Sequence, residues 1–236
     1  MNRFGITGAQ MKSNRKGLFV LLGISFITQA TTSLVGGVIG IGPFTHTENL
    51  AATMHNIAGT ISSVYMGMFL QIVTALVIII LATGLYQTVS HMNRTAAIIA
   101  AGFYFVEAII HVVGQVVIFA VAETSVLYAS SGDSLLLAIA NLLFASRSFI
   151  GAVSMMPFGL GAIPFYYLLT KAKVIPKWLG LWGMITASFI LVGWSLEAFH
   201  VVSVPFALYV PYVPWEWVAS IYIFVKGIRF EYPCYE

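Results

Sequence analysis

The chain is poor in charged residues and nearly free of cysteine. Charged residues make up 8% of its 236 residues, whereas soluble domains carry roughly 25%, so a soluble globular domain is excluded. The one cysteine, Cys234, rules out an intrachain disulfide, and its place near the C-terminus argues against thiol chemistry. The net charge of +3 comes from basic flanks of apolar runs and does not indicate nucleic-acid binding.

What the chain does contain is apolar residues, which make up 59% of it. Because a bilayer core offers no hydrogen-bonding partner to the backbone, each apolar crossing must be a helix. The sequence therefore predicts an all-α fold, a polytopic integral membrane protein with six transmembrane helices that form one domain over residues 1–236. The predicted spans are about 17–42, 61–87, 95–121, 149–170, 175–200 and 215–230.

Lysine and arginine lie at one side of these predicted crossings. They precede the first, separate the second from the third and the fourth from the fifth, and end the sixth: Arg3, Lys12, Arg15, Lys16, Arg94, Lys171, Lys173, Lys177, Lys226 and Arg229. The opposite loops carry only acids, at Glu48, Glu123 and Asp133, and Arg147 alone breaks the pattern. By the positive-inside rule, both termini are predicted to be cytoplasmic.

Polar residues inside the third predicted helix form a stripe. Glu107, His111 and Gln115 are spaced four residues apart, so they share one face of an otherwise apolar helix. Ionisable groups within a bilayer are costly, and this face must turn toward protein or water. The stripe predicts either a ligand site or a hydrogen-bonded contact between helices, and both interpretations stay open.

Further charged groups are predicted at the outer half of the membrane. Glu197 and His200 end the fifth helix, Arg147 precedes the fourth span, and Glu216 opens the sixth helix. The proline- and aromatic-rich segment 204–214 cannot be a continuous helix and would cap them. Together with the stripe, these residues predict an outward-facing polar pocket with an Arg–Glu pairing. Its ligand-binding residues would be Glu107, His111, Gln115, Arg147, Glu197, His200 and Glu216.

A metal site is the main chemical alternative. Glu107 and His111 are four residues apart and Glu197 and His200 three apart, and Glu-x-x-His pairs hold the metals of di-iron helical bundles. The first pair has one residue too many for that motif, and Glu216 would be the only further acid. We therefore predict no metal and no cofactor, with these four residues as the weaker metal-ligand candidates.

Small residues on the first helix predict close packing. Gly36, Gly37 and Gly40 form a small-residue face, a common feature of tightly packed transmembrane helices. No Lys-Ser/Thr pair follows them, so a phosphate-binding loop is not indicated.

Several local patterns together are similar to a known family. They are Leu85–Gln87 with Met92–Ala97, Phe158–Leu160 with Tyr167–Leu169, the turn Ile175–Gly180, and Trp215–Glu216 with Phe224–Gly227. The chain resembles the bacterial six-helix membrane family catalogued as domain of unknown function 4386, over its second to sixth helices. The resemblance implies a bacterial or archaeal plasma membrane and no established activity. The family pattern has an Arg where this chain has Gly102–Tyr104, which leaves His111 or Arg147 as the candidate partner of Glu107.

Three functional hypotheses follow from these patterns. The preferred one is a multi-pass plasma-membrane protein that binds or carries a small or amphipathic molecule, with membrane lipids as its other partners. The second is an integral-membrane enzyme, with or without the assistance of a metal. The third is a structural membrane subunit whose polar groups only lock helices together.

Overall fold

The computed structural model describes residues 8–41, 49–202 and 204–229, and within them it contains helices and no strands. The helices are α1 (Gly8–Ile41), α2 (Leu50–Gly59), α3 (Ile61–Val89), α4 (Arg94–Ser131), α5 (Ser134–Lys171), α6 (Lys177–Ala198), the short 3-10 helix η2 (Phe206–Leu208) and α7 (Tyr212–Arg229). The all-α class predicted from composition is confirmed.

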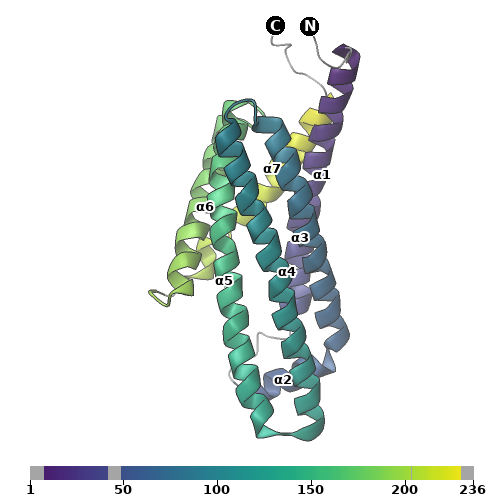
Figure 1. The fold of residues 1–236 in the computed structure, drawn as a ribbon, viewed down its shortest axis with the longest axis vertical. Coiled ribbons are helices and arrows are strands. Elements are labelled where there is room, and N and C mark those ends of the chain that lie inside the picture. Colours follow the sequence, from purple (N-terminus) through teal and green to yellow (C-terminus); the bar gives the residue numbers. More distant parts are fainter. Residues whose placement is uncertain (1–7, 42–48, 203, 230–236) are drawn as a thin grey trace.

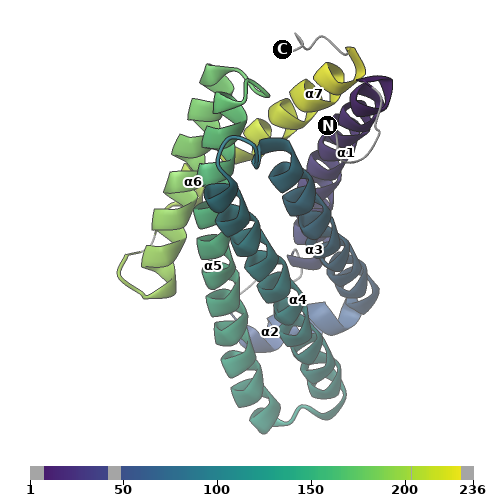
Figure 2. The ribbon, with the colours of Figure 1, turned by 45° about the horizontal axis from the view of Figure 1, so that its top comes forward.

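The long helices form a bundle in which neighbours in sequence are largely neighbours in space. Helix α4 packs between α3 and α5, α6 packs on α5, and α1 packs against both α3 and α7 (Figures 1 and 2). The start of α1 and the end of α7 lie at one end of the bundle, with the α3–α4 and α5–α6 connections (Figure 1). Lys226 near the end of α7 contacts the second of these connections, its Nζ donating to the carbonyl of Val174 at 3.1 Å. We call this the basic end of the bundle.

Five helices are long and apolar enough to cross a membrane, judged over the described residues. They lie in α1, α3, α4, α5 and α6. Many large apolar side chains on their outer faces are exposed, among them Phe69, Ile109 and Trp178. Such surfaces are expected where the solvent is lipid rather than water. The chain is therefore of the membrane type that its composition predicts.

Helices α4 and α5 are longer than the spans predicted from sequence. We expected 95–121 and 149–170, whereas each helix has 38 residues and is about 57 Å long at 1.5 Å per residue. The reason is that the turn between them is short and is capped on both sides. Gly132 adopts a left-handed φ of 66° at the end of α4, and the Asp133 side chain accepts a hydrogen bond from the Leu135 amide at 2.9 Å.

Helix α2 was not predicted. Its N-terminus is set by Asn49, whose side chain accepts a hydrogen bond from the Ala52 amide at 3.2 Å. It packs across α4 near the α4–α5 turn (Figure 1) and buries Met54 and Ile57 in two small apolar clusters. The main apolar core lies nearer the basic end of the bundle, around Phe26, Phe165 and Trp215.

The close packing predicted for the glycines of α1 is confirmed for Gly36 and Gly40. Both face α3, where the Cα of Gly40 lies against Gly67 so closely that a side chain on Gly67 would overlap the α1 backbone. The backbones of α1 and α3 can therefore cross in contact, as small residues permit in membranes.

Candidate functional site

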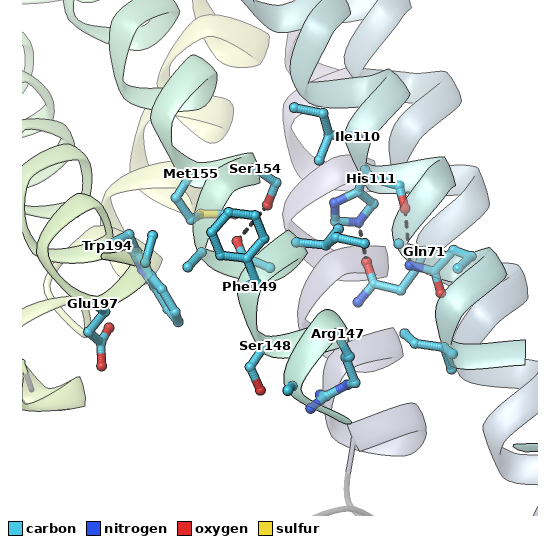
Figure 3. Close-up of a pocket in the computed structure, with 18 of the residues that line it drawn as sticks. Gln71, Ile110, His111, Arg147, Ser148, Phe149, Ser154, Met155, Trp194 and Glu197 are labelled. Atoms are coloured by element: carbon cyan, nitrogen blue, oxygen red, sulfur yellow. Dashed lines mark hydrogen bonds between the residues drawn. The ribbon is translucent and has the colours of Figure 1, made fainter. Parts of the chain in front are cut away.

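A cavity of about 1080 Å³ lies among α1, α3, α4, α5, α6 and the residues that follow α6. Its position along the bundle is set by the Gly36–Gly40–Gly67 crossing, which contributes one wall. Figure 3 shows side chains of α4 on one side, Trp194 and Glu197 of α6 on the other, and α5 residues between them. We call it the polar cavity.

One wall of the polar cavity is a hydrogen-bonded set from α3 and α4. The His111 Nε2 atom lies 2.7 Å from Gln71 Oε1 (Figure 3). The Gln71 Nε2 donates to the Ser33 carbonyl of α1 at 3.2 Å. Gln115 Nε2 donates to the His111 carbonyl at 3.3 Å, while the buried Gln115 Oε1 has no hydrogen-bond partner. The wall therefore has an acceptor with unused hydrogen-bonding capacity.

The other walls join two charged groups to apolar surface. Half-buried Arg147 and exposed Ser148 come from the middle of α5, followed by Phe149 and, further along, Met155. Glu197 near the end of α6 accepts a hydrogen bond from the Tyr209 hydroxyl at 3.3 Å. Burial, and then the Glu197 carboxylate, raise the pKa of Tyr209 to about 12, so its hydroxyl remains a donor at neutral pH.

Aromatic packing fixes the α6 side of the cavity. The ring of Trp194, which lines the cavity, stacks on Tyr209 with a centroid separation of 5.2 Å. The Tyr209 hydroxyl lies against Gly193, where any larger residue would collide with it. The segment after α6 is thus held onto the helix by Tyr209, which the sequence placed in a cap over this region.

A second polar group lies away from the cavity lining and is buried in the main core. Glu216 of α7 accepts a hydrogen bond from Tyr212 Oη at 2.9 Å, and Tyr212 Oη lies 2.8 Å from Tyr166 Oη of α5. Glu107 interacts electrostatically with Glu216 across the interior. We call Gln29, Tyr104, Glu107, Tyr166, Tyr212 and Glu216 the tyrosine–glutamate cluster.

The seven residues predicted as one site are divided between these two places. Five line the polar cavity, namely His111, Gln115, Arg147, Glu197 and His200, whereas Glu107 and Glu216 are in the tyrosine–glutamate cluster. Of the two candidate partners of Glu107, His111 pairs instead with Gln71, and Glu107 Oε2 has no hydrogen-bond partner among the described residues. Whether these residues bind a ligand stays a prediction.

The metal-site alternative is not assembled in the structure. Within the part of the chain that is described, no three His, Cys, Asp or Glu side chains are grouped closely enough to hold a metal ion. His111 and His200 both line the cavity, but Glu107 does not. Two further histidines precede these helices in the sequence: His46 lies outside the described residues, and the His55 ring packs on Tyr128 with centroids 5.4 Å apart.

Sequence reasoning missed Gln71 and the two tyrosines Tyr166 and Tyr212 as interior polar groups. Gln71 was visible as an amide in the middle of a long apolar run, which is a signal of an interhelical hydrogen bond. The tyrosines gave no such signal, because aromatic residues are common at membrane interfaces as well as in cores.

Comparison with known proteins identifies the family. The family model described as Domain of unknown function (DUF4386) matches residues 21–227. This match covers most of the chain, so the chain belongs to that family, and the resemblance carried by the Leu85, Ile175 and Trp215 motifs is confirmed. Neither a curated protein nor a solved structure matches the chain.

Proposed function

We propose that this member of the DUF4386 family is a six-span plasma-membrane protein that binds an anionic, single-chain amphiphile in the polar cavity from the outer side. The observation that carries the proposal is the lining of that cavity. Arg147 and the Gln71–His111 wall supply a cation and polar groups, and Phe149, Met155 and Trp194 supply apolar surface. This combination matches an anionic headgroup attached to an acyl chain.

The size of the cavity supports a ligand of this class. Small-molecule pockets measure roughly 300–1,000 Å³, and the polar cavity has about 1080 Å³. That volume exceeds what a single inorganic ion needs and suits a headgroup with part of a chain. Glycines at positions 36, 40 and 67 leave the α1–α3 wall smooth where such a chain would lie.

The proposed topology has six crossings with both termini in the cytoplasm. Its support is that α1 begins and α7 ends at the basic end (Figure 1), which requires an even number of crossings. Helix α7 has 18 residues, or about 27 Å, close to the roughly 30 Å of a bilayer core. Helices α4 and α5 exceed that thickness, so their ends around Gly132 would project beyond the outer surface with α2.

The binding proposal is tested by ligand-dependent stability. Lysophosphatidylglycerol added to the purified protein in a maltoside detergent should raise its Tm, because a ligand that binds only the folded state stabilises it. Lysophosphatidylcholine of the same chain length should raise it less. Arg147→Gln should abolish most of the difference, since a hydrogen bond to a charged group contributes about 1.5–3 kcal/mol, or tenfold or more in affinity.

The matched control for this experiment is Arg94→Gln. Arg94 is exposed at the basic end, far along α4 from the cavity-lining residues, so the shift should persist in that variant. Equal shifts for the two lysolipids, or a shift that survives Arg147→Gln, would contradict the proposal. If neither lysolipid shifted the Tm, the structural-subunit alternative would be favoured. The His111–Gln71 contact between α4 and α3 supports that alternative.

The topology is tested with the single cysteine. Cys234 lies outside the described residues, and the chain has no other cysteine, so a membrane-impermeant maleimide reports its side without engineering. We expect labelling only after the cells are permeabilised. In a Cys234→Ser background, Ser130→Cys, which is exposed beside the α4–α5 turn, should label in intact cells. The reverse pattern would invert the proposed orientation.

A further inference from the structure

The tyrosine–glutamate cluster places two carboxyl groups in the interior without a basic side chain among their described partners. Glu107 is 4% exposed and Glu216 is 8% exposed. The polar groups that interact with them come from four helices: Gln29 from α1, Tyr104 from α4, Tyr166 from α5 and Tyr212 from α7. The charged group that acts on Glu107 is the other carboxyl, Glu216.

The two carboxyls differ in the donors available to them. Glu216 accepts from Tyr212 Oη at 2.9 Å and also interacts with the Gln29 side chain. Two donors of this kind stabilise a carboxylate, because each replaces a hydrogen bond from water. Glu107 Oε2 has no hydrogen-bond partner although it is fully enclosed. An ionised Glu107 would leave that oxygen without water and without a hydrogen-bond donor.

The position of the pair adds the cost of repulsion. Two carboxylates that interact in a low-dielectric interior are costly to ionise together, and such pairs retain a proton between them. A neutral carboxyl avoids most of the desolvation cost that an unpaired buried ion would carry. The donor asymmetry then assigns the states, with the proton at Glu107 and the negative charge at Glu216.

We propose that Glu107 and Glu216 form a proton-binding site inside the membrane, in which Glu107 holds the proton and Glu216 is the carboxylate held by Tyr212 and Gln29. Glu107 lies one helical turn from His111, which lines the polar cavity. The proposed proton site thus lies beside the polar cavity, but the residues that contact its two carboxyl groups differ from those that line the cavity. The proposal goes beyond amphiphile binding and holds whether or not a ligand occupies the cavity.

Infrared spectroscopy of the full chain tests the assignment. In a maltoside detergent, which has no ester carbonyl, the protein at neutral pH should show a protonated-carboxyl stretching band that shifts in D₂O. Glu107→Gln should remove the band, because Glu216 keeps its donors and its charge. Glu216→Gln should leave it, because the enclosed Oε2 of Glu107 still has no hydrogen-bond partner. Asp133→Asn, at the exposed α4–α5 turn, is the matched control and should also leave the band unchanged.

Three results would overturn the proposal. The first is the absence of the band from the unaltered protein, which needs no variant and so does not depend on whether a variant folds. The second is a band that persists in folded Glu107→Gln. The third is loss of the band when sodium chloride replaces choline chloride at constant pH, which would make the cluster a cation site. None of these outcomes bears on the lysolipid experiment.

Discussion

The polar cavity and the tyrosine–glutamate cluster both include residues of α4, but these residues lie in different surroundings. Glu107 and His111 are one turn apart on α4, yet Glu107 faces a buried interior and His111 lines the cavity. In the cluster, Tyr212 links Tyr166 and Glu216 in a continuous hydrogen-bonded chain. In the cavity, charged and polar groups stand beside unfilled space. The polar groups of the cluster are thus enclosed as in a protein core, whereas those of the cavity line a space that a ligand could enter.

This difference predicts how substitutions in each region behave. Changes in the cluster should cost folding stability, because its groups are enclosed and each removal leaves a buried partner unsatisfied. Changes in the cavity lining should cost less stability and act on binding, except at Gln71, whose side chain joins α3 to α1 and α4. The predictions below run from the largest expected loss of stability to the smallest, and each has a matched partner elsewhere in the chain.

Trp215→Ala should be the most damaging single change. Trp215 is fully buried beside the cluster, where its Nε1 donates to the Leu179 carbonyl at 2.7 Å and its ring packs on Tyr166 with centroids 4.1 Å apart. Truncating a buried tryptophan costs about 3–5 kcal/mol. The loss should appear as a large fall in Tm in detergent.

Trp178→Ala is the control for that change. The Trp178 side chain is 57% exposed on α6, so its removal should change Tm much less. Equal losses for the two tryptophans would show that the α5–α6–α7 interior is not the packed core described here.

Tyr212→Phe should have an intermediate effect. It deletes the hydroxyl that joins Tyr166 to Glu216 and keeps the ring that packs on Trp215. The unsatisfied partners left behind should cost about 1–3 kcal/mol, measured as a lower Tm or a lower denaturant midpoint. Tyr167→Phe, one residue after Tyr166 and exposed on α5, should leave both unchanged. A Tyr212→Phe protein as stable as the Tyr167→Phe protein would mean that the hydroxyl chain contributes nothing to folding.

Much of the fold was predictable because apolar runs in a membrane protein must be helical. The runs that became α1, α3, α6 and α7 were placed within a few residues, apart from the longer N-terminal end of α1. The extended ends of α4 and α5 were not, because their bounds depend on capping at Gly132 and Asp133 rather than on hydrophobicity. Helix α2 is short, and its contacts with α4 stabilise it more than its own pattern indicates.

The candidate site was only partly predictable for a related reason. Four-residue spacing correctly predicted that Glu107 and Gln115 turn inward, since both are buried. Spacing along one helix cannot show which neighbouring helix each residue meets. That depends on the packing of α3 on α4, which brings Gln71 to His111, and on Tyr212, whose hydroxyl binds Glu216 in the core.

Gln115→Leu should have the smallest effect on stability and should leave the Tm close to that of the parent protein. The Gln115 side chain donates only to the carbonyl of His111 in its own helix, and its buried Oε1 is unsatisfied. Replacing an unsatisfied polar group with an apolar one of similar size is nearly neutral or stabilising. We therefore expect a Tm within the equivalent of about 1 kcal/mol of the parent.

The matched change is Gln71→Leu on the facing helix. It removes contacts to both Ser33 and His111, which join α3 to α1 and to α4, so its Tm should fall clearly below that of Gln115→Leu. If Gln115→Leu were instead the more destabilising of the two, the Gln115 amide would have to be satisfied in the folded protein. The α4 wall of the cavity would then have no unused acceptor at Gln115.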